Sequence, residues 1–307
     1  MDLFVEAHAK PPHEVILDLD ATDDPLHGKQ EGRFFHGYYG HYCYLPLYIF
    51  AGDHLLCARL RTANQDGSAG AREEVVRIVG QLRQHWPTVK ITLRADSGFC
   101  REELMSWCEQ NGVDYVLGLA RNRRLEAMLV EALAEAKQRH EETGQAARVF
   151  RELRYQTRET WTRERRVVGK AEQLDKGANP RFVVTSLTSE VWEARALYED
   201  LYCQRGEMEN RVKEQFQLFA DRTSTHWLWS NQLRLMLSAF AYVLLDTLRR
   251  VGLPGTEMAQ AEVQTIRLRL LKIGAVVRVS VRKVWVSLAS AHPTAGLFAH
   301  VYAALRC

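Results

Sequence analysis

The sequence predicts a mixed α/β fold. Short apolar runs bounded by turn residues alternate with segments whose apolar residues recur at helical spacing, which is typical of a sheet covered by helices. The expected strands are Val15–Leu19, Tyr42–Phe50, Leu55–Arg61, Lys90–Ala95 and Tyr115–Leu119. The expected helices in the same part of the chain are Arg72–Trp86, Glu102–Asn111 and Leu125–Glu142.

Local signals justify these elements in chain order. The first strand follows the Pro11-Pro12 break, and the turn sequence Ala51-Gly52-Asp53-His54 joins the next two strands. The first helix has apolar residues at 75, 76, 79 and 82 and is stopped by Pro87. Gly112 is placed to end the second helix, because glycine readily adopts the left-handed conformation found after helices.

A β-rich insertion is expected after the third helix. The runs Arg148–Leu153, Thr160–Val168 and Phe182–Leu187 are rich in Arg, Thr and aromatic residues, whereas helical spacing resumes at Val191 and again over 231–251. The tail is expected to start helical and to become strand-like at Val276–Val286. We therefore divide the chain into a core (1–144), an insertion (145–188), a second part of the core (189–251) and a basic C-terminal region (252–307).

Composition bounds the class of protein. The chain has 307 residues, 46% of them hydrophobic, and a net charge of +3, so total charge alone does not indicate a polyanion partner. The six cysteines form no C-x-x-C pair, which favours reduced thiols. The sequence contains neither a phosphate-binding G-x-x-x-x-G-K-[ST] motif nor a G-x-S-x-G motif, so nucleotide hydrolysis and α/β-hydrolase chemistry are not expected.

Clustered carboxylates at two strand ends are the first functional signal. Asp18, Asp20, Asp23 and Asp24 lie within seven residues, and Asp96 follows the strand Lys90–Ala95. Asp18 and Asp20 share one face of their strand, and ligands of α/β sheets bind at the carboxyl ends of strands. Such a cluster requires a positive partner, either an Arg or Lys side chain or a metal ion. Asp23, Asp24 and Asp96 also fit ordinary turn and cap roles.

A third carboxylate lies in the segment LYCQRGEMENRVKEQF, residues 201–216. On an α-helix, Tyr202, Arg205, Glu209 and Lys213 fall within an arc of about 80°. Two Asp from strand ends and one Glu from a helix are hard oxygen ligands that suit Mg²⁺, and two such ions support phosphodiester chemistry. The alternative for Glu209 and Lys213 is an ordinary surface ion pair.

The order of these motifs resembles the DDE transposases of bacterial insertion sequences, which have an RNase H-like catalytic core. Residues 202–209, Y-C-Q-R-G-E-M-E, are similar to the Y-x2-R-x3-E signature of the branch with a β-rich insertion before its glutamate. DLDATDDPLHGKQE, YYGHYCYLPL, LRADSGF and IRLRLLKIGAVVRVSVRKV look like the thirteen-eighty insertion-sequence family. At the position of the signature's later lysine this chain has Phe216, with Lys213 nearer.

The resemblance implies a site and an activity. Asp20, Asp96 and Glu209 would be the catalytic and metal-binding residues, with two Mg²⁺ ions that Mn²⁺ can replace. Tyr202, Arg205 and Lys213 would contact DNA phosphate. The implied reaction is cleavage at insertion-sequence ends and strand transfer to target DNA by a homodimer, in the bacterial cytoplasm at the nucleoid and without a membrane. Relatives carry a further region before this core, so we expect a truncated copy or an internal start.

Positive charge is concentrated in two zones. Residues 148–170 carry eight Arg or Lys against three Glu, a net of +5, and the tail from Arg249 carries nine against two, a net of +7. Basic residues interleaved with aromatic ones are typical of DNA contact. We therefore expect Trp161, Arg163, Arg165 and Arg166 to bind DNA, with Trp161 stacking on a displaced base. The alternative for this zone is a solvated β face.

Two other functions fit the same motifs. A general metal-dependent nuclease would cut DNA without preferring element ends and would not join strands. A catalytically silent relic of a transposase would fold and bind DNA through its basic zones without chemistry.

Overall fold

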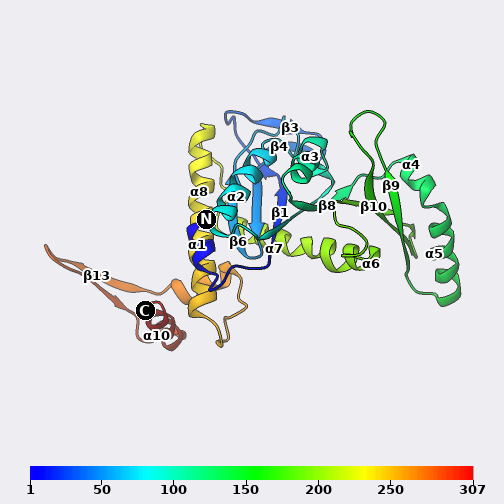
Figure 1. Cartoon of the computed structure of the whole chain (residues 1–307). Coiled ribbons are helices and arrows are strands. Elements are labelled where there is room, and N and C mark those ends of the chain that lie inside the picture. The colour runs from blue at the N-terminus through cyan, green and yellow to red at the C-terminus, as the bar shows by residue number, and fades with distance from the viewer. Residues whose placement is uncertain (307) are drawn as a thin grey trace. The chain divides into compact units, whose positions relative to one another are not determined.

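The computed structural model describes residues 1–306, which divide into two compact units (Figure 1). The first unit comprises Met1–Leu26, Gly32–Gly52 and Leu56–Glu209. The second comprises His27–Glu31, Asp53–Leu55 and the chain from Asn210 onward. All three predicted catalytic carboxylates belong to the first unit.

A nine-stranded mixed sheet forms the centre of the first unit. Its order is β11-β10-β12-β8-β7-β1-β5-β6, with β9 also paired to β10. Strands β1, β7 and β8 are parallel neighbours, whereas β5 is antiparallel to β1. The strands are β1 (Glu14–Ala21), β5 (Leu47–Ala51), β6 (His54–Arg59), β7 (Lys90–Ala95), β8 (Asp114–Leu119), β9 (Ala147–Tyr155), β10 (Arg165–Leu174), β11 (Gly177–Ala178) and β12 (Arg181–Thr185).

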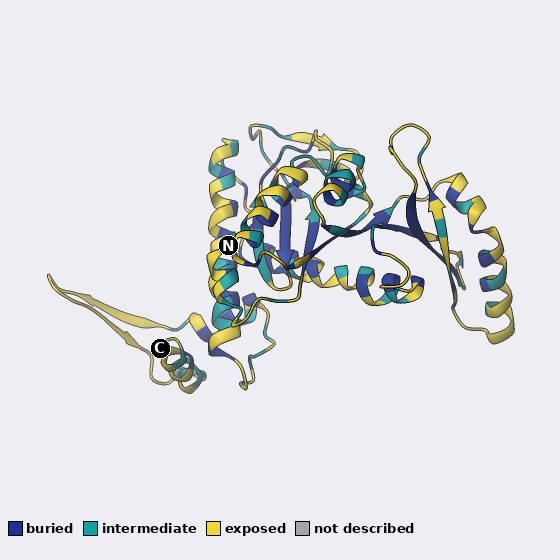
Figure 2. Cartoon of the chain, viewed as in Figure 1, coloured by how far each residue is buried: buried dark blue, intermediate teal, exposed yellow. Residues whose placement is uncertain are grey.

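Helices cover this sheet because its strands carry apolar side chains on both faces. Val15, Leu17 and Leu19 of β1 belong to one large core together with buried residues of α2 (Ala71–His85) and α3 (Glu102–Gln110). Figure 2 shows these central strands as mostly buried. Ile16, which points to the opposite face, packs against a second core that contains Leu197 and Leu201. The mixed α/β prediction is therefore confirmed.

The β-rich segment extends this same sheet. Strand β12 pairs antiparallel with β8, and β10 pairs with both β12 and β9. The helices α4 (Arg123–Met128) and α5 (Val130–Thr143) precede these strands, and α5 packs against β9 and β10. The predicted strands of the insertion are present, but they form no separate sheet.

Two predicted elements are subdivided in the structure. The expected strand 42–50 is split at Leu45-Pro46 into β4 (His41–Tyr44) and β5, and β4 forms a small sheet with β2 (Asp24–Pro25) and β3 (Phe34–His36). The expected helix from Val191 consists of α6 (Ala194–Ala196), a π-helical turn η2 (Leu197–Tyr202), a 3₁₀ turn η3 (Cys203–Arg205) and α7 (Gly206–Gln217). The uniform 100° step assumed for Tyr202 to Glu209 is therefore incorrect.

The second unit is built on the 25-residue helix α8 (Leu228–Gly252). Its partly buried Arg249 donates to Glu214 Oε1 at 2.9 Å and to Asp246 Oδ1 at 3.2 Å. The tail continues through α9 (Val263–Thr265), η4 (Ile266–Leu271), the hairpin β13–β14 (Ala275–Val279, Val284–Leu288) and α10 (Ala295–Ala304). The helical start and strand-like end predicted for this tail are confirmed, and every residue of both hairpin strands is exposed (Figure 2).

Two short elements complete the described chain. They are α1 (Asp2–Glu6) and the 3₁₀ turn η1 (Ser97–Phe99). Within residues 1–306, no helix has the length and apolar character needed to cross a membrane. The cysteines at 43, 57, 100, 108 and 203 are free thiols.

Candidate active site

Asp20 and Asp96 lie side by side at one edge of the sheet. Strands β1 and β7 are parallel and in register, with Asp18 opposite Arg94 and Leu19 opposite Ala95. Asp20 and Asp96 are the next residues along the two strands. The parallel pairing confirms that these two strand ends share one edge. The Asp96 carboxylate also accepts a hydrogen bond from the Gly98 amide at 2.8 Å, which caps η1.

Asp18 has a different environment from Asp20, although both point to the same face. Asp18 is 3% exposed and accepts two hydrogen bonds from the Arg94 guanidinium, at 2.5 and 2.7 Å. Burial raises the pKa of Asp18, and Arg94 opposes that shift. The positive partner predicted for the aspartate cluster is therefore an arginine at Asp18, which leaves Asp20 as the carboxylate at the strand end.

The segment 202–209 places three further polar side chains at this edge. Arg205 Nη2 donates to Glu209 Oε1 at 3.0 Å. The Tyr202 hydroxyl lies against Gly118 of β8, since a Cβ built on Gly118 would be 2.6 Å from that oxygen and 2.8 Å from the Ser97 nitrogen. Tyr202 is therefore held close to the residue that follows Asp96.

Electrostatic coupling joins these side chains into one cluster. Burial is the main cause that raises the pKa of Asp20 to about 6, the charges of Asp96 and Glu209 add to it, and Arg205 opposes it. Burial alone would lower the pKa of Arg205, but Tyr202, Asp20 and Glu209 raise it. The pKa of Tyr202 is raised, chiefly by burial. The cluster thus combines mutually repelling carboxylates with one arginine.

The carboxylates of this cluster fit a divalent cation by their chemistry. Asp20, Asp96 and Glu209 supply hard oxygen atoms, and a cation would relieve the repulsion that contributes to the raised pKa of Asp20. Among residues 1–306, however, no three Asp, Glu, His or Cys side chains are arranged closely enough to hold a metal ion as they stand. Glu209 is bonded to Arg205 and would have to exchange this partner.

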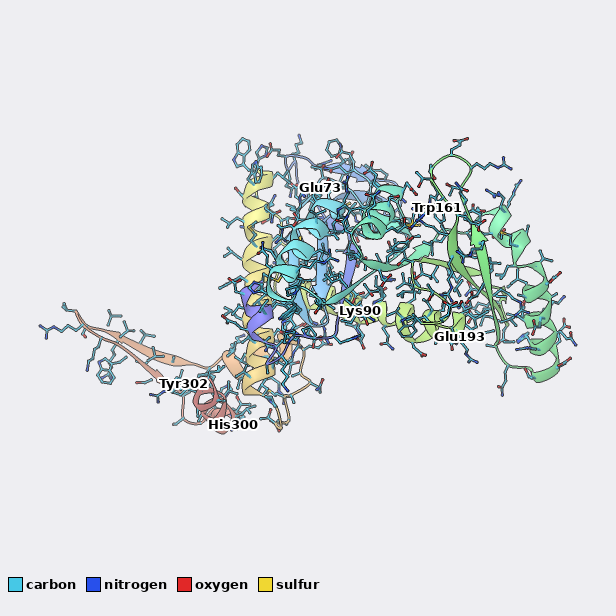
Figure 3. The ribbon with its side chains drawn as sticks, viewed as in Figure 1. Glu73, Lys90, Trp161, Glu193, His300 and Tyr302 are labelled. Atoms are coloured by element: carbon cyan, nitrogen blue, oxygen red, sulfur yellow. The ribbon has the colours of Figure 1, made fainter. Side chains whose placement is uncertain are left out.

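The residues predicted to bind DNA differ in their positions. Lys213 is exposed and bonds to Asn210 in the second unit. Arg163 is also exposed and pairs with Glu109. Trp161, labelled in Figure 3, is only 6% exposed and packs edge-on against Tyr155, with ring centroids 5.7 Å apart. The structure thus corrects the expectation that Trp161 lies on the surface and stacks on a displaced base.

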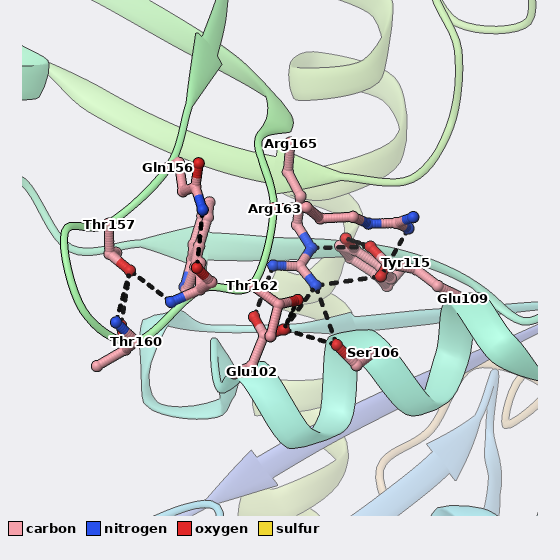
Figure 4. A network of polar contacts seen from close by, with 11 residues as sticks. Glu102, Ser106, Glu109, Tyr115, Gln156, Thr157, Thr160, Thr162, Arg163 and Arg165 are labelled. Atoms are coloured by element: carbon pink, nitrogen blue, oxygen red, sulfur yellow. Dashed lines mark hydrogen bonds and ion pairs between the residues drawn. The ribbon is translucent and has the colours of Figure 1, made fainter.

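Arg165 and Arg166 are buried as well. Arg165 binds Glu102 at 2.6 Å and Glu109 at 2.8 Å, so it connects β10 to α3 (Figure 4). Arg166 donates to the Leu187 carbonyl at 2.8 Å and to Glu152 at 2.5 Å. These side chains already satisfy carboxylates and carbonyls inside the protein, which corrects the expectation that they form a basic surface.

Two residues that shape the cluster could not be identified as readily from the sequence. Arg94 was not singled out, although it stands two residues before Asp96, as Asp18 does before Asp20, and this shared spacing was a usable signal. Gly118 carried no signal, because its requirement for a small side chain depends on the distant Tyr202.

Comparisons with known proteins give the family. The model of the family described as transposase DDE domain group 1 matches residues 1–307. No curated protein matches the chain. A structure described as a cryo-EM structure of the piggyBac transposase synaptic complex with hairpin DNA is similar with a TM-score of 0.45 and 12% identity, over 80% of this chain and 49% of that one. The chain thus spans about half the length of that neighbour. Since the family model covers the whole chain, the protein belongs to the transposase DDE domain group 1 family.

Proposed function

We propose that this protein is a transposase that cuts DNA at insertion-sequence ends and joins the freed 3′ ends to target DNA. The main support is the cluster at the carboxyl ends of β1 and β7. There Asp20 interacts electrostatically with Asp96, Arg205 and Glu209, and Arg205 is hydrogen-bonded to Glu209. Family membership supports the reaction class. The motifs of the thirteen-eighty insertion-sequence family support the finer assignment.

Each residue of the cluster has a proposed role. Asp20, Asp96 and Glu209 would hold divalent cations, with Mg²⁺ as the natural ion and Mn²⁺ as its substitute. The chemistry supplied there would be activation of a water or a 3′-hydroxyl and stabilisation of the leaving oxygen of a phosphodiester. Arg205 and Tyr202 bind the phosphate beside the scissile bond, because a guanidinium fork and a hydroxyl both donate to phosphate oxygens.

An RNase H-like core is part of this proposal. Strands β1, β7 and β8 are parallel neighbours, with Asp20 near the end of β1 and Asp96 directly after β7, and the antiparallel strand β5 lies on the other side of β1. The helical segment that leads to Glu209 packs on the same face of the sheet as Asp20. This arrangement supports the predicted core, and the four domain boundaries of the sequence analysis remain predictions.

In the β-rich segment, only the exposed basic residues are proposed to contact DNA. Arg154 and Arg158 are exposed near the loop between β9 and β10, and neither forms an ion pair with another described residue. Arg163 is 58% exposed beside them and shares Glu109 with Arg165. We assign phosphate contact to these three arginines and to Lys213, and we exclude the buried Trp161, Arg165 and Arg166.

A second copy of the chain is the proposed protein partner. Helix α8 exposes an apolar stripe with spacings of four, three and four residues, which is typical of helix pairing. Its members are Leu233, Leu237, Phe240 and Leu244, each between 54% and 62% exposed. An identical stripe on a second copy is a matching partner for this surface.

The deciding experiment measures cleavage and joining of labelled DNA that carries candidate element ends, in Mg²⁺ and in Mn²⁺. The wild-type protein is compared with Asp96→Asn and with the control Asp175→Asn, whose side chain is 93% exposed. We expect end-specific products from the wild type and the control only. Cleavage without end preference would favour the nuclease, and specific binding without cleavage would favour the relic.

A further inference from the structure

One buried arginine joins β1 and β7, which lead to the two proposed catalytic aspartates, to the turn η2, which precedes Glu209 in the chain. Arg94 of β7 is 6% exposed. Its Nε and Nη2 donate to the two oxygens of Asp18 on β1, and its Nη1 donates to the Leu201 carbonyl of η2 at 2.7 Å. The guanidinium is therefore bonded to both of the other elements at once.

The sheet register places this junction directly beneath the cluster. Asp18 and Arg94 are paired across β1 and β7, and both lie two residues before the carboxylates at the strand ends. Because side chains two apart share a face, Asp18, Arg94, Asp20 and Asp96 all point to the same side. Ile16 on this face and Tyr202 both pack against the second core, which contains Leu201.

The contact with Leu201 lies at the start of the functional segment. Leu201 immediately precedes Tyr202, at the change from the π-helical turn η2 to the 3₁₀ turn η3. Irregular turns of this kind are uncommon and occur often at functional sites. A donor fixed to the sheet therefore sets where Tyr202, Arg205 and Glu209 stand relative to the strand ends.

We propose that Arg94 is a positioning residue for the transposase reaction and that Asp18 is its counter-charge. This inference rests on the proposed function, because the group it positions is the proposed catalytic cluster. Arginine suits the role because a planar guanidinium bonds a carboxylate with two donors and retains a third donor for a carbonyl. A lysine ammonium lacks this fork geometry.

A neighbouring pair on the same two strands provides the control. The hydroxyl of Thr92, two residues before Arg94, donates to Oε1 of Glu14, four residues before Asp18, at 2.6 Å and on the same face. This pair joins β1 to β7 as Asp18 and Arg94 do. The contact with Leu201 distinguishes Arg94, so Thr92→Val should alter the strand pair without moving the segment 201–209.

The test uses two altered proteins beside this control. Arg94→Lys keeps the charge pair with Asp18 and loses the fork. The double variant Asp18→Leu/Arg94→Met removes both buried charges together, and such replacements are often neutral or stabilising. Circular dichroism and thermal melting establish that each variant folds.

Two readouts separate positioning from mere stability. The first is the kinetics of end cleavage, for which we expect kcat to fall by about 100-fold and KM for DNA to change less than about twofold. The second is the mobility of a nitroxide on the exposed Cys203, with Cys100 and Cys307 replaced by serine. We expect greater mobility in both Arg94 variants and wild-type mobility in Thr92→Val.

Each outcome decides the inference. Folded Arg94 variants with unchanged nitroxide mobility overturn it, whatever their activity. Unchanged kcat in an active background overturns it as well, and so does an equal loss in Thr92→Val. If the wild type itself does not cleave DNA, the proposed function fails, and the nitroxide measurement still determines whether Arg94 holds the segment.

Discussion

The hydroxyl of Tyr202 lies over Gly118 of β8, beside the backbone of Asp96 and Ser97. A Cβ at Gly118 would come within 2.6 Å of the hydroxyl oxygen and within 2.8 Å of the Ser97 nitrogen. Gly118 follows Leu117, which pairs with Ala95, so it stands beside Asp96 in the sheet. The space left by this glycine therefore allows Tyr202, 84 residues further along the chain, to reach the strand end that carries the second aspartate.

The first prediction is that Gly118→Ala impairs both folding and catalysis. The added methyl must displace either the Tyr202 hydroxyl or the backbone at Ser97, and overpacking of this kind costs about 1–3 kcal/mol. We expect a lower free energy of unfolding in urea and a lower kcat for end cleavage. Gly80→Ala on α2 is the control, because a Cβ there contacts nothing within 4 Å. Wild-type stability and cleavage in Gly118→Ala would contradict the prediction.

Features of this site that depend on neighbouring residues could be predicted from the sequence, whereas features that depend on contacts between distant residues could not. Strand ends with Asp20 and Asp96 were readable, because alternation and strand type are local properties. The distinction between Asp18 and Asp20 needed the pairing of Asp18 with Arg94, which is 76 residues away. The helical arc of Tyr202 to Glu209 assumed regular α-helix, and the π and 3₁₀ turns that replace it have no simple residue pattern.

The second prediction concerns the network in Figure 4. Arg165 has a 2% exposed side chain between Glu102 and Glu109, whereas Arg163, with 58% exposure, contacts Glu109 alone. Arg165→Met would leave partly buried carboxylates without their main partner, which typically costs about 3–5 kcal/mol. Arg163→Met should cost about 0–1 kcal/mol, as exposed pairs do. Urea unfolding of both variants measures the difference, and equal losses would refute the assignment.

The third prediction is the pH dependence of stability. Burial opposes the shift, but hydrogen bonds from Arg165, Ser106 and Thr162 dominate and lower the pKa of Glu102 to about 2. Burial also opposes the shift at Glu109, whose pKa is lowered by hydrogen bonds from Arg165, Arg163 and Tyr115. A carboxylate with a depressed folded-state pKa stabilises the fold above its unfolded pKa of about 4.3, and this contribution is lost as pH falls toward the folded value.

We therefore expect the free energy of unfolding to fall between about pH 4.5 and pH 2. The fall should be shallower in Glu102→Gln, which cannot take up a proton. Glu73→Gln is the control, because Glu73 is exposed on α2 (Figure 3). Parallel pH profiles for wild type and Glu102→Gln would show that Glu102 makes no such contribution. Urea titrations at several pH values supply the profiles.

The basic zone 148–170 shows why the number of charges along the chain predicts only part of the proposed DNA surface. Six of its eight cations have carboxylate partners, and several of these partners lie outside the zone, such as Glu102, Glu109 and Glu135. Charge density along the chain does not reveal these partners. The charge pattern did identify the right segment. Two of its exposed arginines, Arg154 and Arg158, form no ion pair in the described structure.

The fourth prediction follows from this distinction. Each phosphate contact adds about one unit to the slope of log affinity against log salt. Arg154→Gln and Arg158→Gln should each weaken DNA binding and reduce the slope by about one. Arg151→Gln, whose arginine is engaged with Glu135, should change the slope less. Fluorescence anisotropy at several salt concentrations measures the slopes, and identical slopes for all three variants would exclude this surface from DNA contact.

The fifth prediction concerns the exposed stripe of α8. Leu237 and Phe240 are 62% and 59% exposed, and an apolar surface on a helix of this length is unfavourable in water unless a partner covers it. If the partner is a second copy, Leu237→Glu places two like charges at the contact and should shift the protein from dimer to monomer. Val191→Glu, at an equally exposed apolar residue outside the stripe, should leave the mass unchanged. Light scattering with and without DNA measures both masses. A monomeric wild type under all conditions would remove the second copy from the proposal, and an unchanged dimer in Leu237→Glu would move its interface away from α8.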